Sequence, residues 1–335
     1  MNEPVLAPYF HPTTIVFVDD NAGFLQSLEF DLPEDLSYVS YLFPEEALAA
    51  INSRAHLPTL YERCYGPLIH DPQPGAAQID LKVLEREIDH INRFNRFSTV
   101  MIDYSMPNIS GLEFSRQIED PYIKRVLLTG VADEVTAVAA FNDGLIDHYY
   151  PKSSLRDRTS IIPLIAHMQG VYFSQFNRAL CFEHLVPGSI LNDPAVRTAL
   201  VALFERLDIV EYYLAHNPLG FLLLRADGSR VRCLVAHQRE IEAQAEIARR
   251  HQAPGRVVRK LSQGRAIAFL PEDPDFYLGR EDYAWEECLV PCQPIPRADD
   301  WRFGYLENPP LDIDIDPEAS CYNRYLRSGQ PRGIQ

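Results

Sequence analysis

Short apolar segments alternate with helical segments in the first half of the chain, and this alternation constrains the fold more than any other feature. Each predicted strand is a β-branched or aromatic run of the kind that parallel sheets bury on both faces. The predicted strands are Thr14–Val18, Tyr38–Phe43, Ser98–Ile102, Arg125–Leu128 and Asp147–Tyr150. The predicted helices between them are Asn21–Leu32, Pro44–Ile51, Gly111–Ile118 and Glu134–Phe141. This order predicts a doubly wound α/β domain around a five-stranded parallel sheet.

A long segment breaks the alternation between the second predicted helix and the third predicted strand. Residues 52–97 lie there, where a connection of a few residues is usual. Within this segment, Leu84, Ile88 and Ile91 have helical spacing and predict an extra amphipathic helix over Ile79–Phe94. We interpret residues 52–97 as a helical insertion, which either packs on the surface of the domain or forms a surface for a partner or dimer.

The second half of the chain indicates a separate α+β domain. A helix-rich stretch covers Ser154–Leu185, and a second helix starts at Asp193-Pro194 and continues through Ala195–Ala215. Two apolar runs on either side of Asp227-Gly228 predict a β-hairpin. A charged helix and three further strands are predicted at His237–Gln252, Ala266–Leu270, Cys288–Val290 and Arg302–Leu306. The predicted divisions are an α/β domain over 12–155, a helical linker over 156–190 and an α+β domain over 191–335.

The chain is strongly acidic, with 31 basic and 47 acidic side chains and a formal net charge of −16. This excess repels nucleic-acid phosphates and anionic lipid, so it argues against DNA binding and against attachment to a membrane surface. Six basic residues nevertheless cluster around Ala253-Pro254-Gly255, namely Arg249, Arg250, Arg256, Arg259, Lys260 and Arg265. We interpret them as a solvated helix end and loop, with a phosphate- or nucleotide-binding surface as the alternative and DNA as a weaker one.

Cysteine usage and the absence of long apolar runs indicate the compartment. No segment has the pattern of a signal peptide, and no apolar run approaches the roughly 20 residues that span a bilayer. Six scattered cysteines are too few for a disulfide-stapled fold, so we expect a reducing cytoplasm and no membrane insertion. The spacing of Cys288 and Cys292, with Cys321, suggests a zinc site, but no matching second pair of ligands follows. We therefore favour free thiols.

Five polar side chains fall where the predicted strands of the first half end. Asp19 and Asp20 follow the first strand, and Asp103 follows the third. Thr129 ends the fourth strand, and Lys152 lies just past the fifth. Because the carboxyl ends of parallel strands meet at one edge of a sheet, we expect these side chains to converge. Carboxylates that converge need a cation to offset their repulsion, and Mg²⁺ suits their hard oxygen ligands. A lysine and a hydroxyl beside them can hold a phosphoryl group.

Residues 14–155 resemble the receiver domain of two-component response regulators. The motifs that carry the resemblance are Ile15–Asn21, Val100–Gly111, Val126–Gly130 and Tyr149–Lys152. The most specific of them is the pattern Asp-x-x-Met-Pro-x-x-x-Gly after a strand. The resemblance implies that Asp103 is the phosphoacceptor, and that Mg²⁺ is bound by Asp19, Asp20, Asp103 and the backbone carbonyl of Ser105. It further implies that Lys152 and Thr129 complete the catalytic site, and that Tyr149 is an aromatic switch rather than only a buried strand residue.

The resemblance also implies partners and a mode of signalling. A receiver catalyses phosphoryl transfer to itself from a sensor histidine kinase or a phosphotransfer protein. The added charge then biases a two-state equilibrium, which we expect to cause homodimerisation or release of the second domain. Two features depart from the family. Here a proline, Pro151, precedes Lys152, whereas in the family a proline commonly follows the lysine. The insertion over residues 52–97 is also unusually long.

The output of the second domain is less defined by sequence. It shows no P-loop, no dinucleotide fingerprint and no diguanylate cyclase or phosphodiesterase signature, so enzymatic activity there stays open. We expect an output that works through protein contacts and does not bind DNA, with a regulated enzyme or a nucleotide-binding effector as the alternative. The whole arrangement resembles response regulators of the α-hydroxyketone quorum-sensing type.

Overall fold

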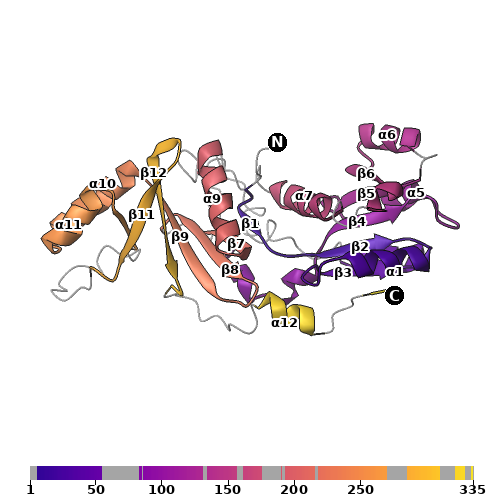
Figure 1. Ribbon diagram of the computed structural model, residues 1–335, viewed down its shortest axis with the longest axis horizontal. Coiled ribbons are helices and arrows are strands. Elements are labelled where there is room, and N and C mark those ends of the chain that lie inside the picture. The colour runs from indigo at the N-terminus through magenta and orange to yellow at the C-terminus, as the bar shows by residue number, and fades with distance from the viewer. Residues whose placement is uncertain are drawn as a thin grey trace, which may run out of the picture. The chain divides into compact units, whose positions relative to one another are not determined.

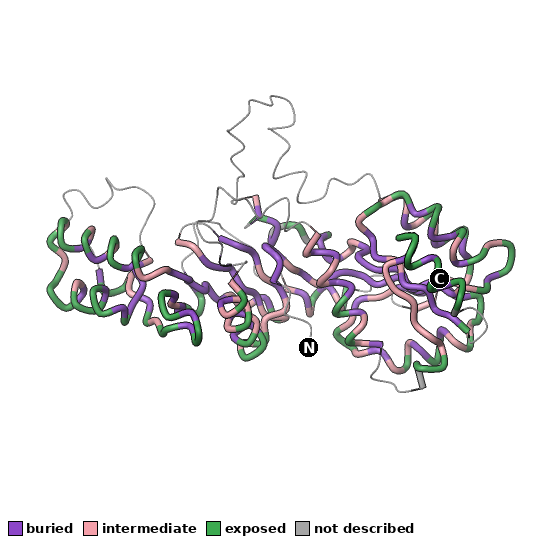
Figure 2. The backbone as a smooth tube through the Cα atoms, turned by 90° about the horizontal axis from the view of Figure 1, so that it is seen from above, coloured by how far each residue is buried: buried purple, intermediate pink, exposed green. Residues whose placement is uncertain are grey.

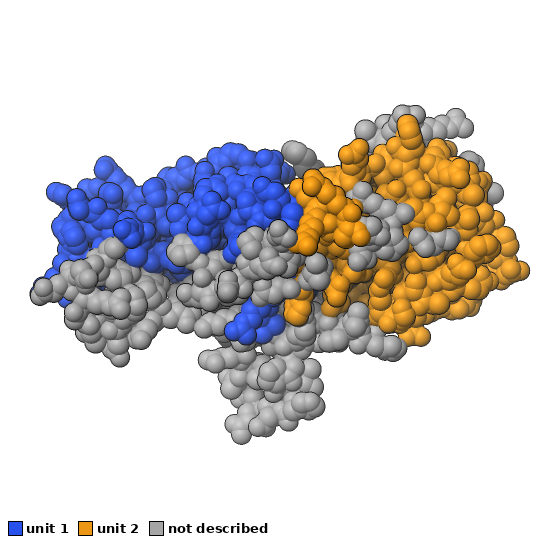
Figure 3. Space-filling model, turned by 90° about the horizontal axis from the view of Figure 1, so that it is seen from below, with its two compact units in different colours: residues 1–10, 64–89, 180–321 blue, residues 11–63, 90–179, 322–335 orange. Residues whose placement is uncertain are grey.

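The computed structural model describes residues 6–54, 83–84, 86–130, 134–156, 161–175, 190, 193–215, 218–269, 285–309, 321–328 and 333–334. The chain divides into two units (Figure 3). The first, called the parallel-sheet unit, comprises His11–Arg63, His90–Ala179 and Tyr322–Gln335. The second, called the antiparallel-sheet unit, comprises Met1–Phe10, Cys64–Asp89 and Leu180–Cys321. The chain therefore passes between the units five times, which differs from the simple succession of ranges expected from the sequence.

The parallel-sheet unit contains the predicted five-stranded sheet (Figure 1). Its strands are β2 (Thr14–Val18), β3 (Tyr38–Tyr41), β4 (Phe97–Asp103), β5 (Lys124–Thr129) and β6 (His148–Pro151). They lie in the order β3-β2-β4-β5-β6, and every neighbouring pair is parallel. The prediction of a doubly wound α/β domain is confirmed.

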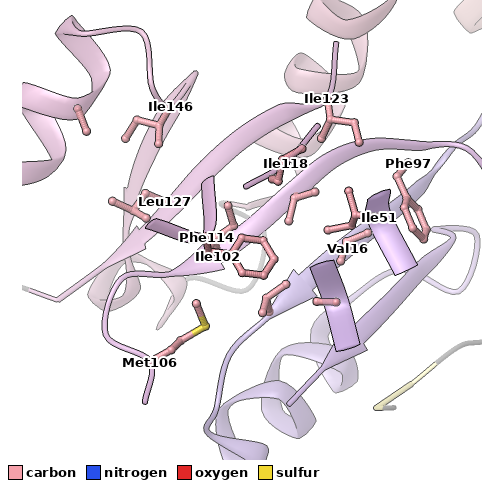
Figure 4. Packing of buried hydrophobic residues seen from close by; sticks show 14 of the residues in the cluster. Val16, Ile51, Phe97, Ile102, Met106, Phe114, Ile118, Ile123, Leu127 and Ile146 are labelled. Atoms are coloured by element: carbon pink, nitrogen blue, oxygen red, sulfur yellow. The ribbon is translucent and has the colours of Figure 1, made fainter. Parts of the chain in front are cut away.

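Helices cover both faces of this sheet, because successive strand residues point to opposite faces. On one face, Ile15 and Phe17 pack with α1 (Ala22–Asp31) and α7 (Ile161–Ser174). On the other face, strand residues pack with α2 (Pro44–Asn52), α5 (Gly111–Arg116) and α6 (Glu134–Asn142). Figure 4 shows this second cluster, with Val16, Ile102 and Leu127 on strands and Ile51 and Phe114 on helices. Burial on both faces explains why the strands are apolar throughout.

Helix α7 covers part of the range that we expected to be a linker, 156–190. Its residues Ile161, Ile165 and Met168 are buried against one face of the parallel sheet. The helix therefore belongs to the core of this unit, because without it the apolar side chains of β4 and β5 on that face would meet water. The expected helical stretch also extended to Leu185, and residues 176–185 lie outside the described part of the chain.

The insertion between α2 and β4 is described only near its end. In the described residues, the predicted helix over Ile79–Phe94 is broken: Val83 and Leu84 are helical, and two 3₁₀ helices follow, η1 (Arg86–Asp89) and η2 (Ile91–Asn95). His90 between them is extended, with φ −87° and ψ 92°, which interrupts a continuous helix. Leu84 and Ile88 are fully buried, as their spacing suggested. The helical insertion is thus present in part, in a broken form.

The antiparallel-sheet unit is built on one seven-stranded sheet in the order β1-β7-β8-β9-β12-β11-β10. The strands are β1 (Tyr9–Phe10), β7 (Ile209–Ala215), β8 (Gly220–Arg225), β9 (Arg230–His237), β10 (Ala266–Ala268), β11 (Leu289–Ile295) and β12 (Ala298–Glu307). The helices are α9 (Pro194–Arg206), α10 (Gln238–Arg250) and α11 (Gly255–Ser262). The predicted hairpin around Asp227-Gly228 is the pair β8 and β9, and an α+β output domain is confirmed.

One predicted helix in this unit is half strand. We expected a helix through Ala195–Ala215, but α9 ends at Arg206 and β7 starts at Ile209. Asp208 between them has a positive φ of 54°, which turns the chain out of the helix. Strand β7 is fixed by partners distant in sequence, since it pairs with β1 on one side and β8 on the other. Non-local pairing outweighs the helical spacing of its apolar residues.

The C-terminal segment returns to the parallel-sheet unit, which the sequence did not indicate. Helix α12 (Tyr322–Arg327) packs Tyr322 and Tyr325 against Phe94. The Tyr325 hydroxyl donates to Asn95 Oδ1 at 2.8 Å, and the Tyr322 hydroxyl donates to the carbonyl of Asp35 at 2.8 Å. These contacts join the end of the chain to the start of β4 and to the loop before β3.

We predict that Tyr325→Phe lowers the free energy of unfolding of the chain by about 1 kcal/mol, because the buried tyrosine loses its hydrogen bond to the half-buried Asn95 Oδ1. Urea unfolding followed by far-UV circular dichroism measures the change. Tyr305→Phe is the matched control, because Tyr305 is 37% exposed and should change stability by less than about 0.5 kcal/mol. Equal stability of Tyr325→Phe and the native chain would contradict a structural role for the hydroxyl.

Candidate functional site

Three carboxylates converge at the carboxyl edge of the parallel sheet, as the sequence predicted. Asp19 and Asp20 follow β2, and Asp103 ends β4, the neighbouring strand. One carboxylate oxygen of each lies within 4.8 Å of the others. Asp19 and Asp103 are buried and Asp20 is exposed. Like charges this close repel one another strongly, so the cluster requires compensating positive charge.

Lys152 supplies part of that charge. Its ammonium Nζ lies 2.6 Å from Asp19 Oδ2 and 2.8 Å from Asp103 Oδ1, so it donates to both buried carboxylates. Burial by itself lowers the pKa of Lys152, but the hydrogen bonds to Asp103 and Asp19 outweigh it and the pKa is raised. The lysine is therefore charged throughout the physiological range. The ammonium also lies 4.5 Å from the centre of the Phe24 ring, a cation–π contact that sequence reasoning missed.

The environment of Asp19 differs from that of a surface carboxylate. Burial raises the pKa of Asp19, while the Lys152 hydrogen bond and the backbone N–H of Asn21 oppose the shift. That N–H donates to Asp19 Oδ1 at 2.9 Å. Asn21 in turn caps α1, since its side chain accepts from the N–H of Phe24 at 3.0 Å. The helix start therefore fixes the orientation of the first carboxylate.

The loop after β4 contains the remaining predicted ligand and the motif glycine. Asn108 has a positive φ of 66°, a conformation that asparagine tolerates better than most residues. Ser110 caps α5 by accepting from the N–H of Glu113 at 3.2 Å. Ser105 lies in this loop and forms an isolated bridge with Ser110. These contacts hold a tight loop directly beside Asp103, in which the carbonyl of Ser105 remains a predicted metal ligand.

Gly111 at the start of α5 explains the last position of the motif. A Cβ atom placed there would lie 2.4 Å from the carbonyl oxygen of Asp103 and 2.8 Å from Leu127 Cδ1. Both distances are too short for any real side chain. The glycine is thus required for the helix to approach the backbone of Asp103 closely.

Thr129 lies on β5, the strand next to β4, and Tyr149 lies on β6, the edge strand beyond it. Thr129 ends β5, is buried, and is paired in register with Pro151 of β6. Tyr149 is half-buried, and its ring meets that of Phe141 on α6 edge to face at 6.4 Å between centroids. The unusual Pro151 is therefore the last residue of a sheet strand, and Lys152 begins the 3₁₀ helix that follows. This order still lets Lys152 reach both carboxylates.

The donor set fits a magnesium ion. Asp19, Asp20 and Asp103 offer only hard carboxylate oxygens, and the exposed position of Asp20 leaves the cluster open to water on one side. Magnesium binds through one or two carboxylates and keeps several of its waters, which matches an open cluster of this kind. The residues present can hold the ion that the resemblance implies.

The cysteines form no metal cluster in the described ranges. Asp19, Asp20 and Asp103 are the only group of three or more acidic, histidine or cysteine side chains close enough to share an ion there. The thiol of Cys292 donates to the carbonyl of Gly264, and that of Cys321 to the carbonyl of Ala226. Cys233, Cys288, Cys292 and Cys321 form no disulfide, and Cys64 and Cys181 lie outside the described residues.

We predict that Cys233 in the native protein resists iodoacetamide at about pH 8, where an ordinary thiol is partly ionised. Burial raises the pKa of Cys233 to about 12, so raising the pH toward the ordinary thiol pKa leaves it protonated as well as inaccessible. Peptide mass spectrometry should show alkylation of Cys233 only after unfolding in urea. Cys288, which is half-buried, is the internal control and should react in the folded state. Rapid native alkylation of Cys233 would contradict its placement.

None of the helices in the described ranges is both long and apolar enough to span a membrane. No protein-family model matches the chain, and no curated protein matches it. Among solved structures, a receiver domain from Clostridium thermocellum covers 51% of this chain at 18% identity, with a TM-score of 0.30. A CheY-like receiver domain from Methanospirillum hungatei covers 49% at 17% identity, with a TM-score of 0.33.

One solved structure matches nearly the whole chain. The Legionella pneumophila response regulator LqsR is 30% identical, with a TM-score of 0.79. The match covers 97% of this chain and 96% of LqsR, so it includes both the parallel-sheet unit and the antiparallel-sheet unit. The chain therefore belongs to the family of receiver-domain response regulators that includes LqsR.

Proposed function

We propose that this protein is switched by phosphorylation of Asp103, with a histidine kinase or a phosphotransfer protein as the donor. The observation that carries the proposal is the position of Lys152, which donates to Asp19 and Asp103 at an edge that also holds Asp20. Positioned positive charge around an acceptor carboxylate is what phosphoryl transfer mainly requires.

The transfer step follows from these contacts. A carboxylate oxygen of Asp103 attacks the phosphorus of a phosphohistidine, the P–N bond breaks, and the departing imidazole nitrogen takes a proton from solvent. Asp103 becomes an acyl phosphate. Lys152 exchanges its bond to Asp103 for one to a phosphoryl oxygen, while its bond to Asp19 keeps it in place. When bound by Asp19, Asp20, Asp103 and the carbonyl of Ser105, Mg²⁺ would neutralise charge on the phosphoryl oxygens.

The response is proposed to spread through Thr129 and Tyr149. The Thr129 hydroxyl, at the end of the strand beside Asp103, would donate to the phosphoryl group. Tyr149 is a half-buried residue of β6 whose ring contacts Phe141 of α6. The outer side of α6 exposes Val135, which is 84% exposed, and Phe141. A shift of these groups would alter this face and favour homodimerisation or a domain rearrangement.

The form of the rearrangement is limited by connectivity. Because the chain passes between the units five times, the antiparallel-sheet unit cannot be released on a single flexible linker. We propose that it acts through protein contacts rather than DNA. An open pocket of about 420 Å³ at the β8–β9 turn is lined by Asp227, Gly228, Ser229, Arg230, Asn308 and Pro309, and its described lining holds no group of three possible metal ligands.

The likeness to LqsR over the full length supports a cytoplasmic regulator of the quorum-sensing type. The test of the proposed switch is incubation of the whole chain with acetyl phosphate and Mg²⁺. We expect a phosphoryl adduct by intact mass spectrometry, and we expect EDTA to prevent it. A chain that never acquires the adduct, from acetyl phosphate or from a phosphorylated phosphotransfer protein, would overturn the proposal.

A further inference from the structure

The antiparallel-sheet unit carries a concentrated basic surface that the proposed switch does not use. Residues 249–265 hold six basic side chains and no acidic one, in a chain whose formal net charge is −16. We call this segment, from the end of α10 through α11, the basic hairpin. All six basic residues are exposed, namely Arg249, Arg250, Arg256, Arg259, Lys260 and Arg265. Figure 2 shows exposed residues along the outer sides of these two helices.

The basic hairpin is a folded surface with fixed geometry. Ala248 of α10 packs with Val257 and Leu261 of α11, so the apolar sides of the two helices face inward. Arg249 donates to Ser262 Oγ at 2.9 Å, which joins the end of α10 to the end of α11. The charged residues therefore lie on the outer side of two helices that are packed against each other.

Most of this charge has no partner in the described part of the chain. Arg249 pairs with Glu246 at 2.9 Å, and Arg256 pairs with Glu286. Arg250, Arg259, Lys260 and Arg265 form no ion pair with any described residue. Helix-dipole stabilisation accounts for Arg259 and Lys260, which lie in the last turn of α11, but it does not account for Arg256 in its first turn.

Complementary charge lies at the carboxyl edge of the parallel sheet. The first 53 residues contain no lysine or arginine. Glu45 and Glu46 in the first turn of α2 are exposed and pair with no described cation. They follow β3, whose last residue, Tyr41, is paired with Val18, so they lie just past the end of the strand next to the one that leads to Asp20. Beside them Phe43 is 57% exposed. We call Asp20, Glu45, Glu46 and Phe43 the acidic edge.

We propose that the basic hairpin of one copy binds the acidic edge of a second copy. Two copies that each have a net charge of −16 repel one another over most of their surfaces. Attraction requires a basic surface on one copy to face an acidic surface on the other, and the basic hairpin is such a surface. Phe43 adds apolar area that the contact removes from water. A nucleic acid is disfavoured because the basic hairpin contains no Phe, Tyr or Trp to stack on bases, and because the rest of the chain repels phosphates.

Phosphorylation strengthens this contact. A phosphoryl group on Asp103 adds negative charge to the same edge that holds Asp20, Glu45 and Glu46. This part of the inference rests on the proposed function, and it adds a homodimer contact at the acidic edge to the α6 face described above. Each contact joins unlike surfaces, so two copies close into a pair when both contacts form at once.

Sedimentation velocity of the whole chain tests the inference, over a range of protein concentrations, at low and high salt. We expect a dimer that weakens with salt. Arg259→Glu/Lys260→Glu and Glu45→Arg/Glu46→Arg should each weaken it roughly tenfold, by replacing attraction with repulsion. The combined four-residue swap should restore association, which a misfolded variant could not do. Arg206→Glu is the matched control, since it reverses an exposed charge in the last turn of α9 and should leave the dimer unchanged.

Three outcomes would overturn the inference. The first is a monomer at every concentration in both phosphorylation states, and the second is a dimer that the charge reversals leave intact. The third is binding of a short DNA duplex by the basic hairpin without self-association. Intact mass on the same samples separates this inference from the proposed function. If the phosphorylated protein associates no more tightly than the unphosphorylated protein, the proposed strengthening of the contact at the acidic edge is wrong. If the protein is never phosphorylated, the proposed switch is wrong, and the charge-reversal variants still test the contact between the basic hairpin and the acidic edge.

Discussion

Asp103→Asn should abolish the phosphoryl adduct that acetyl phosphate and Mg²⁺ form on the native chain. The amide cannot form an acyl phosphate. Among the described carboxylates, Asp19 is the only other one that is buried at this sheet edge and accepts a hydrogen bond from Lys152. Asp19 is less available as an acceptor, because its Oδ1 is bonded to the N–H of Asn21 and its Oδ2 to Lys152. The adduct should therefore fall to background, as measured by intact mass spectrometry.

The substitution is also conservative for folding. Asparagine keeps the size of the side chain and an oxygen that can accept from Lys152, while it removes one of three repelling charges. Asp143→Asn, at an exposed position after α6, is the matched control and should be labelled like the native chain. Labelling that persists in Asp103→Asn would show that the acceptor lies elsewhere.

Gly111→Ala should destabilise the parallel-sheet unit by about 2–3 kcal/mol or more, because the added methyl group overlaps a backbone atom that cannot move aside. The nearest atom is the carbonyl oxygen of Asp103, at 2.4 Å from the new Cβ. Relief of the overlap must push α5 away from β4 or shift the acceptor residue. The same variant should therefore also be labelled more slowly by acetyl phosphate.

Gly170→Ala makes the same chemical change with the opposite expected sign. Gly170 lies within α7, and a Cβ there meets nothing within 4 Å. Alanine is the better helix former, so stability should rise by about 0.5–1 kcal/mol.

Urea unfolding followed by far-UV circular dichroism reports both units, whereas tryptophan fluorescence reports the antiparallel-sheet unit alone, because Trp285 and Trp301 both lie there. Equal unfolding midpoints for the two variants would contradict the close packing at Gly111.

Much of the site could be predicted because it depends on local pattern and one topological rule. Apolar β-branched runs mark buried strands, and parallel strands end at a common edge. The sequence alone thus places Asp19, Asp103 and Lys152 together, and the fold does bring them within hydrogen-bond distance. The contact of Lys152 with Phe24 could not be predicted, since its signal is only an aromatic residue in the first turn of a helix.

The sequence by itself determined the parallel sheet, its order of strands and helices, and the residues at its carboxyl edge. Only the tertiary structure decided how the rest of the chain is shared between the units. Strand β1 joins the antiparallel sheet ahead of the first parallel strand, β7 is a strand rather than the end of a helix, and α12 returns to the parallel-sheet unit. These features depend on pairing and packing between residues as much as 205 and 311 positions apart. Such contacts leave no periodic signal in the local sequence.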